Sequence, residues 1–386
     1  MGLTEIMVVA GEASGDGHAA DLVAQLRARE PQLRFFGMGG PRMAAQGVDR
    51  IYGAHEISVM GFAEVLPKVR RIAAVLRGLV RAAGRRRPSC AVLVDVPDFN
   101  LRLAARLKRL GIPVVYYVSP MIWAWRPNRI HQIARVVDAM LCILPFEEAY
   151  YRERGVPARY VGSPVLEQVP APAPAAHFRR ALGLPESAPT LALLPGSRRG
   201  EVSRLLPDLV QAAALMRKET PGLQILVPVA PGLVRSEVED SFTAAGVSAT
   251  LLDGRAPEAV GASDVAVVAS GTATLEAGLM GRPLVVVYRI APTSYWIAKR
   301  LVRLPAFSLV NLLAGKPLVP ELLQDEVTPG RIVKEVRALW EGPAREAVVE
   351  GLGQLRASLG SPGAAARAAD EVLSVVNRRS AMPPAS

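Results

Sequence analysis

Short apolar runs alternate with longer helical patterns along most of this chain, and several of these runs consist of continuous valine, isoleucine and leucine. The runs lie at residues 6–10, 33–37, 91–96, 114–118, 140–144 and 159–161, and then at 191–194, 225–229, 250–252, 265–268 and 284–287. Helical patterns such as residues 18–29 and 101–110 lie between them. Runs that are apolar throughout, rather than at every second position, are typical of strands buried on both faces of a parallel sheet. The sequence therefore predicts an α/β protein with doubly wound parallel sheets.

The length and a proline-rich segment together predict two domains. A chain of 386 residues suits two domains of roughly 100–200 residues each. Residues 164–174 read PVLEQVPAPAP, and the prolines should stiffen this segment into an extended linker. We predict two Rossmann-like domains facing a cleft, at residues 1–165 and 175–345. Helices at residues 346–379 are expected to pack back on the first domain or on a partner subunit, and residues 380–386 to form a frayed tail.

The formal net charge of +11 favours anionic partners, which include nucleic acid, anionic lipid and phosphorylated metabolites. Cys90 and Cys142 lie in apolar stretches and read as core residues. The four histidines are scattered, so neither a metal nor another cofactor is expected. No apolar run approaches the ~18 residues that a membrane-spanning helix needs, and the N-terminus lacks the pattern of a signal peptide. The sequence predicts a cytoplasmic protein whose contact with a membrane is peripheral.

Ligands of such sheets bind at the carboxyl ends of the strands, so the loops that follow the strands are the candidate sites. The first of these loops, GEASGDG, carries Glu12, Ser14, Gly15 and Asp16. Its small residues would let the backbone turn and approach a ligand, although it matches neither the Walker A nor the GxGxxG pattern. The alternative is a plain turn in which Asp16 caps the next helix.

Two carboxylates and an amide follow the run at residues 91–96, namely Asp95, Asp98 and Asn100. Pro97 ends the strand and forces an exposed loop. A carboxylate there can act as a general base when a hydroxyl comes within hydrogen-bond reach. The alternatives are a structural role, in which Asp95 accepts backbone N–H groups, and a metal site.

The loop after residues 114–118 contains Trp123 and Trp125 beside Arg126 and Arg129. Aromatic and basic side chains together can stack a base or hold a sugar. The alternative is a loop that is packed down by its own tryptophans.

Two loops in the second half look like anion-binding helix starts. They carry Ser197 and Arg198 in one case, and Ser270, Gly271 and Thr272 in the other. Backbone N–H groups at the start of a helix bind phosphate readily. Glu276 follows one turn into the second helix, where it either accepts hydrogen bonds from a ribose diol or is only a favourable acid in a first helical turn.

One segment combines apolar and basic side chains in a way that suits a lipid surface. Its apolar residues are Val59, Met60, Phe62, Val65, Leu66, Val69, Ile72 and Leu76, and its basic residues include Arg70, Arg71 and Arg77. Basic amphipathic segments bind membrane interfaces, at about 1 kcal/mol per basic residue near anionic lipid. The alternative is an ordinary helix that packs on the sheet and exposes a basic face to water.

These loops, taken in order, resemble the motifs of the lipid-A-disaccharide synthase family. They read GEASGD at 11–16, GGPRM at 39–43, SVMGFAEVL at 58–66, DVPDFN at 95–100, YVSPMIWAWR at 117–126, PGSR at 195–198, ASGTATLE at 269–276 and SLVNLLAGKPLVPELLQDEVTP at 308–329. The chain departs from the family at Ser163, where the family often has histidine, and at Val310, where it often has proline.

The resemblance implies a GT-B glycosyltransferase that needs no metal. Its donor would be UDP-2,3-diacylglucosamine and its acceptor 2,3-diacylglucosamine 1-phosphate, known as lipid X. The product would be a β(1→6)-linked lipid A disaccharide 1-phosphate, released with UDP. The resemblance also implies a peripheral protein on the inner face of the cytoplasmic membrane, and suggests a homodimer.

The resemblance also implies roles for the candidate residues. An inverting transfer needs one general base, for which we predict Asp98 with Asp95 in support. Ser197, Arg198 and the amides of Ser270, Gly271 and Thr272 would stabilise the departing UDP, while Glu276 would hold the ribose and Asn311 the diphosphate or donor sugar. The acceptor or donor sugar would be surrounded by Glu12, Ser14, Gly15, Asp16, Asn100, Trp123 and Arg126.

Two other functions stay open on the sequence. A different GT-B enzyme, such as a transferase that uses UDP-N-acetylglucosamine or an epimerase, would need no acyl pocket. A nucleic-acid binder is permitted by the charge, but the basic residues are spread along the chain and no nucleic-acid-binding motif is present. We therefore expect no nucleic-acid partner.

Overall fold

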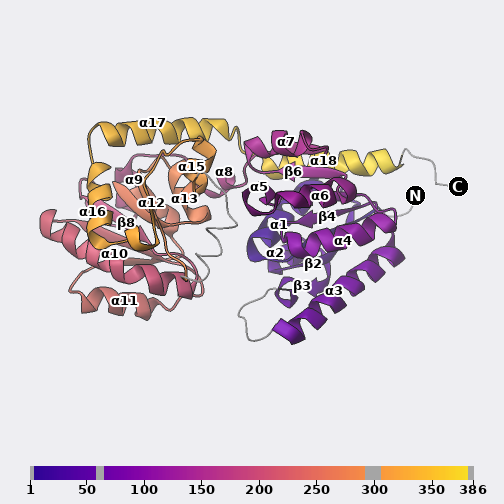
Figure 1. Ribbon diagram of the computed structural model, residues 1–386, viewed down its shortest axis with the longest axis horizontal. Helices are drawn as coiled ribbons and strands as arrows, with labels where there is room; N and C mark the ends of the chain where they lie inside the picture. Colours follow the sequence, from indigo (N-terminus) through magenta and orange to yellow (C-terminus); the bar gives the residue numbers. More distant parts are fainter. Residues whose placement is uncertain (1–3, 58–64, 292–305, 381–386) are drawn as a thin grey trace. The chain divides into compact units, whose positions relative to one another are not determined.

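The computed structural model describes residues 4–57, 65–291 and 306–380 (Figure 1). The chain forms two compact units. Unit 1 is Met1–Pro164 together with Ser361–Ser386, and unit 2 is Val165–Gly360. Three residues of the predicted lipid-facing segment, Val59, Met60 and Phe62, lie outside the described residues, and the side chains of Val65 and Leu66 are not described either.

Unit 1 is built on a seven-stranded sheet with the order β3-β2-β1-β4-β5-β6-β7, in which all neighbouring strands are parallel. The strands are β1 (Glu5–Ala10), β2 (Arg34–Gly39), β3 (Asp49–Gly53), β4 (Cys90–Val94), β5 (Val114–Tyr117), β6 (Ala139–Cys142) and β7 (Ala158–Tyr160). Every residue of β4 is buried, as the continuous apolar run predicts. The sequence does not predict β3, because this edge strand is largely exposed and has no apolar run.

Helices cover both faces of this sheet. They are α1 (Ala13–Arg29), α2 (Pro41–Ala45), α3 (Val65–Arg86), α4 (Pro97–Arg109), α5 (Ile122–Trp125), α6 (Ile130–Val136), α7 (Pro145–Arg152) and α18 (Ala364–Ser380). Alternate residues of β1 point to opposite faces, so Met7 and Val9 pack with α3 and α4, whereas Ile6 and Val8 pack with α1 and α18. Helix α18 thus completes one of the two cores of unit 1.

Unit 2 contains a six-stranded sheet with the order β10-β9-β8-β11-β12-β13, again parallel throughout. Its strands are β8 (Thr190–Leu194), β9 (Gln224–Val229), β10 (Thr250–Asp253), β11 (Val265–Ala269), β12 (Leu284–Tyr288) and β13 (Glu321–Leu323). Its described helices are α8 (Val165–Gln168), α9 (Ala175–Ala181), α10 (Arg199–Glu219), α11 (Arg235–Ala244), α12 (Ala256–Ala262), α13 (Thr272–Leu279), α15 (Leu309–Ala314), α16 (Pro329–Ala338) and α17 (Pro343–Ser358).

The segment between the units differs from the extended linker that its prolines predict. Residues 165–168 form α8, and Val165, Leu166 and Val169 are buried in the core of unit 2. Apolar side chains between the prolines therefore anchor the segment by burial. The two C-terminal helices also behave differently from each other, because α17 stays with unit 2 and only α18 returns to unit 1.

Each sheet changes its winding direction at one point, between β1 and β4 in unit 1 and between β8 and β11 in unit 2. In doubly wound sheets, ligands bind outside the carboxyl ends of the strands at this point. The loops that follow β1 and β4 begin at Gly11 and Asp95, and those that follow β8 and β11 begin at Pro195 and Ser270. Four of the candidate loops therefore lie in pairs where the fold favours a ligand site.

Asp16 ties the loop after β1 to the loop after β2. Its carboxylate accepts hydrogen bonds from the backbone N–H groups of Gly40 (2.7 Å), Arg42 (2.9 Å) and Met43 (3.2 Å) at the start of α2. The side chain is only 3% exposed. Asp16 therefore caps a neighbouring helix, and its carboxylate is used within the protein rather than offered to a sugar.

We expect Asp16→Ala to lower the free energy of unfolding by about 3 kcal/mol, because hydrogen bonds to a charged group contribute roughly 1.5–3 kcal/mol each and these three share one carboxylate. Asp21→Ala removes an exposed carboxylate from the same helix and should change this free energy by less than about 0.5 kcal/mol. Urea denaturation followed by circular dichroism measures both variants. Equal losses in the two variants would contradict the role given to Asp16.

Candidate active site

The turn after β4 has a strained backbone that fixes where α4 begins. Asp95 and Val96 have φ values of 52° and 44°, in the left-handed region that a β-branched residue such as valine rarely adopts. The carbonyl oxygen of Asp95 accepts hydrogen bonds from the Tyr116 hydroxyl (2.6 Å) and from Asn100 Nδ2 (2.7 Å). Burial raises the pKa of Tyr116 well above its usual value, so this hydroxyl stays protonated and donates. Strain that is held by buried partners is common at functional sites.

Asn100 supports this turn from within. Its side chain is fully buried, and Nδ2 donates a second hydrogen bond to the carbonyl oxygen of Val94 at 3.1 Å. Its Oδ1 is also buried and has no hydrogen-bond partner among the residues that the structure describes. We therefore revise the role of Asn100 from sugar contact to support of the strained turn.

Asp95 and Glu12 bring two carboxylates to the switch point of unit 1. Burial raises the pKa of Asp95; a hydrogen bond from the Val96 backbone opposes this shift, and the negative charge of Glu12 adds to it. Glu12 and Ser14 are exposed at the start of α1, but Gly15 is buried. A Cβ at position 15 would lie 3.6 Å from the Ala10 side chain and 3.7 Å from that of Val94. Gly15 thus faces the sheet, where a Cβ would make ordinary van der Waals contacts with β1 and β4.

Asp98 lies in the first turn of α4 and forms ion pairs with two arginines from the loop after β5. Arg126 Nη1 lies 3.2 Å from Asp98 Oδ1, and Arg129 Nη2 contacts the same oxygen. Arg126 also lies over the Trp125 ring, 4.1 Å from its centroid. The other oxygen, Oδ2, has no hydrogen-bond partner in the described part of the chain, and the side chain is 61% exposed. One oxygen is therefore anchored while the other is accessible to a ligand.

Trp123 holds the loop after β5 against the buried side chain of Glu147. Its Nε1 donates to Glu147 Oε1 at 3.1 Å, and its ring meets Phe146 edge-on with centroids 5.0 Å apart. Glu147 Oε2 accepts a hydrogen bond from Ser119 Oγ at 2.5 Å. The geometry favours the self-packed alternative for Trp123, and the loop's exposed groups are Trp125 and Arg126 instead.

Glu147 is a residue of the site region that sequence reasoning missed. It is 1% exposed, and burial raises its pKa to about 7, against the opposing effect of its hydrogen bonds from Ser119, Trp123 and backbone N–H groups. In the sequence it follows Pro145 and reads as an ordinary acid in the first turn of a helix. Only the fold shows that the loop after β5 rests on it.

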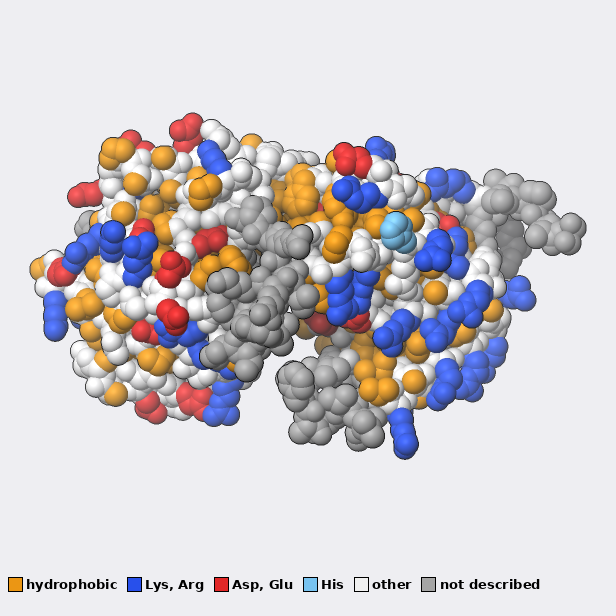
Figure 2. Space-filling view, viewed as in Figure 1, with side chains coloured by type: hydrophobic (Ala, Val, Ile, Leu, Met, Phe, Trp, Pro, Cys, Tyr) orange, Lys and Arg blue, Asp and Glu red, His pale blue; other side chains and the backbone are white. Residues whose placement is uncertain are grey.

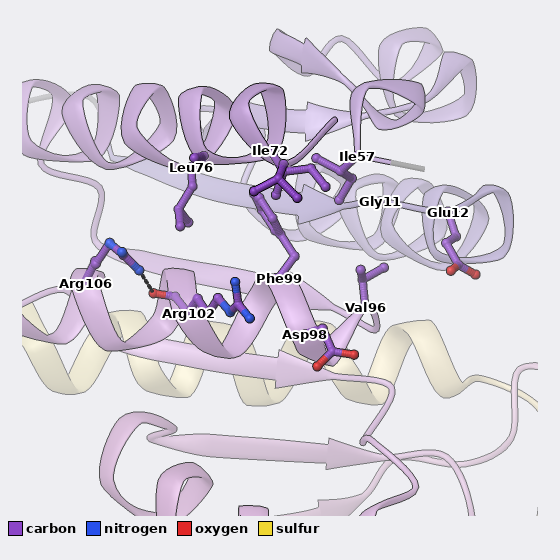
Figure 3. A pocket seen from close by; sticks show the side chains of 12 residues that line it. Gly11, Glu12, Ile57, Ile72, Leu76, Val96, Asp98, Phe99, Arg102 and Arg106 are labelled. Atoms are coloured by element: carbon purple, nitrogen blue, oxygen red, sulfur yellow. Dashed lines mark hydrogen bonds between the residues drawn. The ribbon is translucent and has the colours of Figure 1, made fainter. Parts of the chain in front are cut away.

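A pocket of about 480 Å³ lies between α3 and α4, next to the loops after β1 and β4 (Figure 3). Its apolar lining includes Ile57, Val69, Ile72, Leu76, Val96 and Phe99, and its polar lining is Glu12, Asp98, Arg102 and Arg106. Figure 3 shows the Ile57, Ile72 and Phe99 side chains close together and the Asp98 and Glu12 carboxylates at one end. The structure therefore places three of the predicted acyl-binding residues, Val69, Ile72 and Leu76, beside the predicted general base.

The outer face of α3 is basic. Arg70 and Arg77 are exposed, Arg71 pairs with Glu56, and Val69 is an apolar side chain with 56% exposure. Figure 2 shows Lys and Arg side chains gathered over α3 and α4 beside an apolar strip. One helix thus contributes apolar residues to the pocket and basic residues to the surface.

In unit 2, two helix starts lie at the switch point. Gly196 has φ 114°, and the Ser197 backbone N–H donates to Glu201 Oε2 at 3.3 Å. The guanidinium of Arg198, directly before α10, is exposed and has no hydrogen-bond or ion-pair partner among the described residues. Ser270, Gly271 and Thr272 lead into α13, and Ser270 Oγ donates to the Phe307 carbonyl oxygen at 3.3 Å. The Ser270 N–H itself donates to the Val287 carbonyl oxygen at 2.9 Å, so the amides of Gly271 and Thr272 and the guanidinium of Arg198 are the groups that suit an anionic ligand.

Glu276 lies within the first two turns of α13. Its side chain is half-buried, and burial raises its pKa. It has no side-chain hydrogen bond to any of the described residues. A partly desolvated carboxyl group without a protein partner is a candidate ligand contact.

The side-chain amide of Asn311, predicted to hold the diphosphate or the donor sugar, is buried and hydrogen-bonded within unit 2. Its Nδ2 donates to the Val319 carbonyl oxygen (2.8 Å) and to Glu321 Oε1 (2.9 Å), and its Oδ1 accepts from the backbone N–H groups of Leu318 and Val319 (both 2.8 Å). These four bonds use the full capacity of a side-chain amide. Glu321 in turn accepts from the backbone N–H groups of Phe307 and Ser308. Asn311 therefore shapes the turn that touches Ser270.

The two departures from the family motifs both lie in buried positions. Val310 is fully buried in the core of unit 2. Ser163 is 1% exposed, and its hydroxyl has no hydrogen-bond partner among the described residues. Within the described ranges, the structure contains no cluster of three or more His, Cys, Asp and Glu side chains that could hold a metal ion. In the same ranges, none of the helices has the length and apolar character needed to cross a membrane.

Solved structures with the same fold define the class of protein. A UDP-GlcNAc 2-epimerase from Neisseria meningitidis has a TM-score of 0.63 at 12% identity, and the match covers 96% of this chain and 100% of that chain. A calicheamicin glycosyltransferase also has a TM-score of 0.63, at 18% identity, with coverage of 99% and 100%. Identities this low speak for the fold alone. The chain has the GT-B fold of glycosyltransferases.

The family follows from closer relatives. The family model of lipid-A-disaccharide synthetase matches residues 6–355. A lipid-A-disaccharide synthase of Myxococcus xanthus is 61% identical over 372 residues, which are 96% of this chain and 97% of the relative. One of Anaeromyxobacter dehalogenans is 55% identical over 374 residues, with coverage of 96% and 97%. The chain belongs to the lipid-A-disaccharide synthetase family, which confirms the resemblance of its motifs, and it is an enzyme of this glycosyltransferase family.

Glu147 should make the stability of unit 1 depend on pH. Its pKa is raised from 4.5 to about 7 in the folded protein, so the folded state binds this proton more tightly than the unfolded state. The resulting stabilisation is full below pH 4.5 and is lost as the pH rises through 7. Because Glu147→Gln cannot ionise, its stability relative to wild type should rise by roughly 3 kcal/mol between pH 5 and 8.

Urea denaturation at a series of pH values measures this difference. Glu153→Gln, which removes an exposed carboxylate just beyond the same helix, controls for the loss of charge alone. A constant difference between Glu147→Gln and wild type across this pH range would show that Glu147 is not the group that titrates.

Proposed function

We propose that this enzyme joins UDP-2,3-diacylglucosamine to 2,3-diacylglucosamine 1-phosphate, and releases UDP and the β(1→6)-linked disaccharide 1-phosphate. The observation that carries this proposal is the apolar pocket beside Asp98 at the switch point of unit 1. A transferase whose substrates are water-soluble sugars does not need an apolar pocket of this kind. Family membership supports the same substrates, because the named relatives are lipid-A-disaccharide synthases.

Asp98 would act as the general base that takes the proton from the acceptor 6-hydroxyl. Two guanidinium groups anchor its Oδ1, so Oδ2 is the oxygen available to a hydroxyl at hydrogen-bond distance. Asp95 would support it from the strained turn, two residues before Pro97. The attack displaces UDP from the anomeric carbon in a single step, which inverts an α-linked donor to a β-linked product.

The donor would bind at the switch point of unit 2. Negative charge grows on UDP as the bond breaks, and Arg198, the Ser197 and Ser270 hydroxyls and the amides of Gly271 and Thr272 would stabilise it. Glu276 would accept hydrogen bonds from the ribose hydroxyls. Asn311 and Glu321 would contribute indirectly, because they hold the turn at Phe307–Ser308 against Ser270.

The membrane contact would be made by α3. Exposed Arg70 and Arg77 would face anionic head groups, and Val69 would enter the interface. The enzyme would then lie on the inner face of the cytoplasmic membrane, where acylated substrates would reach the pocket from the lipid phase.

The proposed reaction is tested by mass spectrometry on purified protein with both diacylated substrates in detergent micelles. The tetraacyl disaccharide 1-phosphate should form together with UDP. Parallel reactions contain UDP-N-acetylglucosamine alone or with a soluble acceptor. Turnover in these reactions, with the acylated substrates left intact, would favour a different nucleotide-sugar enzyme of the same fold.

Asp98→Ala should lower kcat by roughly 100- to 10,000-fold, because positioned general bases contribute about this much. Affinity for UDP should stay within about twofold of wild type, since Asp98 and the donor loops belong to different units. Asp21→Ala, on the exposed face of α1, is the matched control. Near-normal turnover of Asp98→Ala would exclude this base.

Glu276→Gln should weaken UDP binding by roughly tenfold, since a hydrogen bond to a charged group is replaced by a neutral one. Titration calorimetry with UDP measures this directly. Glu239→Gln, which alters an exposed acid of α11 in the same unit, should bind UDP like wild type. Equal affinities for the two variants would remove Glu276 from the donor site.

A further inference from the structure

Asp98, Arg102 and Arg106 lie on one face of α4. Residues four apart in a helix project from the same side, and all three side chains line the pocket (Figure 3). Along the helix axis, each of these residues lies about one turn, or about 6 Å, beyond the previous one. One carboxylate and two guanidinium groups therefore form a row along one side of a single cavity.

Unlike Arg86 and Arg129, these two arginines form no ion pair with a residue that the structure describes. Arg86 pairs with Glu5 and Asp49, and Arg129 pairs with Asp98. Arg106 donates only to the backbone carbonyl oxygen of Arg102, at 2.9 Å, and Arg102 is exposed. Neither has a carboxylate partner among the described residues. Two unpaired guanidinium groups beside an apolar wall are suited to an amphiphile with a doubly charged head group.

The spacing matches the acceptor in the proposed reaction. In a hexose 1-phosphate, the phosphate is carried by C1 and the 6-hydroxyl by the carbon attached to C5, and C1 and C5 flank the ring oxygen, so the two groups project several ångströms apart. A rise of about 6 Å from Asp98 to Arg102 is comparable with this separation. A hydroxyl on Asp98 then brings the phosphate to Arg102 and Arg106, while Ile72, Leu76 and Phe99 line the space for an acyl chain.

We propose that Arg102 and Arg106 form the phosphate subsite of the acceptor and make the enzyme select a phosphorylated glycolipid. Binding of the phosphate to these arginines positions the acceptor so that its 6-hydroxyl reaches Asp98. This inference rests on the proposed function, and the source of the phosphate is the acceptor itself rather than a phospholipid of the membrane. The arginines are binding residues and take no part in proton transfer.

The central test compares wild type with the double variant Arg102→Gln, Arg106→Gln. Two acceptors are used, 2,3-diacylglucosamine 1-phosphate and the same glycolipid without phosphate. The double variant should raise KM for the phosphorylated acceptor by roughly 10- to 100-fold, with kcat within about threefold of wild type. Its preference for the phosphorylated acceptor should disappear. An unchanged preference, with the disaccharide still formed, would overturn the subsite and leave the proposed function intact.

Arg109→Gln provides the matched control. Arg109 is an exposed arginine of the same helix that does not line the pocket, so its KM should equal that of wild type. A rise in KM equal to that of the double variant would show a general effect of surface charge and would overturn the proposal. If the double variant does not fold, Arg102→Gln alone carries the test, because its side chain is exposed.

A binding measurement separates this inference from the proposed function. Calorimetry with hexadecyl phosphate in neutral micelles should show binding to wild type and at least tenfold weaker binding to the double variant, whether or not the disaccharide forms. Flotation with phosphatidylglycerol vesicles should be the same for both proteins. Loss of vesicle binding in the double variant, without a change in acceptor preference, would assign the arginines to the membrane surface instead.

Discussion

The left-handed turn at Asp95 and Val96 is the feature on which the site of unit 1 depends. A β-branched residue in this conformation is unfavourable by roughly 1–3 kcal/mol, and the fold holds it there through two hydrogen bonds to one carbonyl oxygen. The turn decides at which residue α4 begins. A shift of one residue would rotate the helix by about 100° and take Asp98, Arg102 and Arg106 away from the pocket together. The position of these three side chains is therefore set by the backbone geometry of a single turn.

Buried polar side chains hold the other candidate loops in place in a similar way. Asp16 holds the start of α2, Glu147 holds the loop after β5, and Asn311 with Glu321 holds the turn beside Ser270. Each lies below the surface, where an unpaired polar group would be costly, and each is satisfied mainly by backbone or loop groups. The residues proposed to meet a ligand, such as Asp98, Arg126 and Arg198, are by contrast exposed.

The sequence predicts the fold well because burial on both faces leaves a direct signal. Runs such as residues 91–96 and 265–268 can hardly be anything except central strands, whereas β3 is exposed and leaves no run. The loops at the switch points are predictable for the same reason, since each follows a recognisable strand. The sequence does not predict the roles of Asp16, Gly15, Asn100 and Asn311. It does not say whether a small or polar residue faces a ligand or the protein's own backbone. Glu147 gives no signal at all, since its burial is a property of the fold.

Helix α18 packs in the same core as α1, although the two helices lie far apart in the sequence. This arrangement has a consequence for synthesis on the ribosome. Unit 2 is continuous in sequence, so it can fold as soon as residue 360 has emerged. Unit 1 begins first but lacks Ala368, Ala369 and Val372 until these residues have emerged as well. Until then the part of α1 that packs against α18 is uncovered and open to chaperones. The half of the enzyme that is made first is therefore the last to mature.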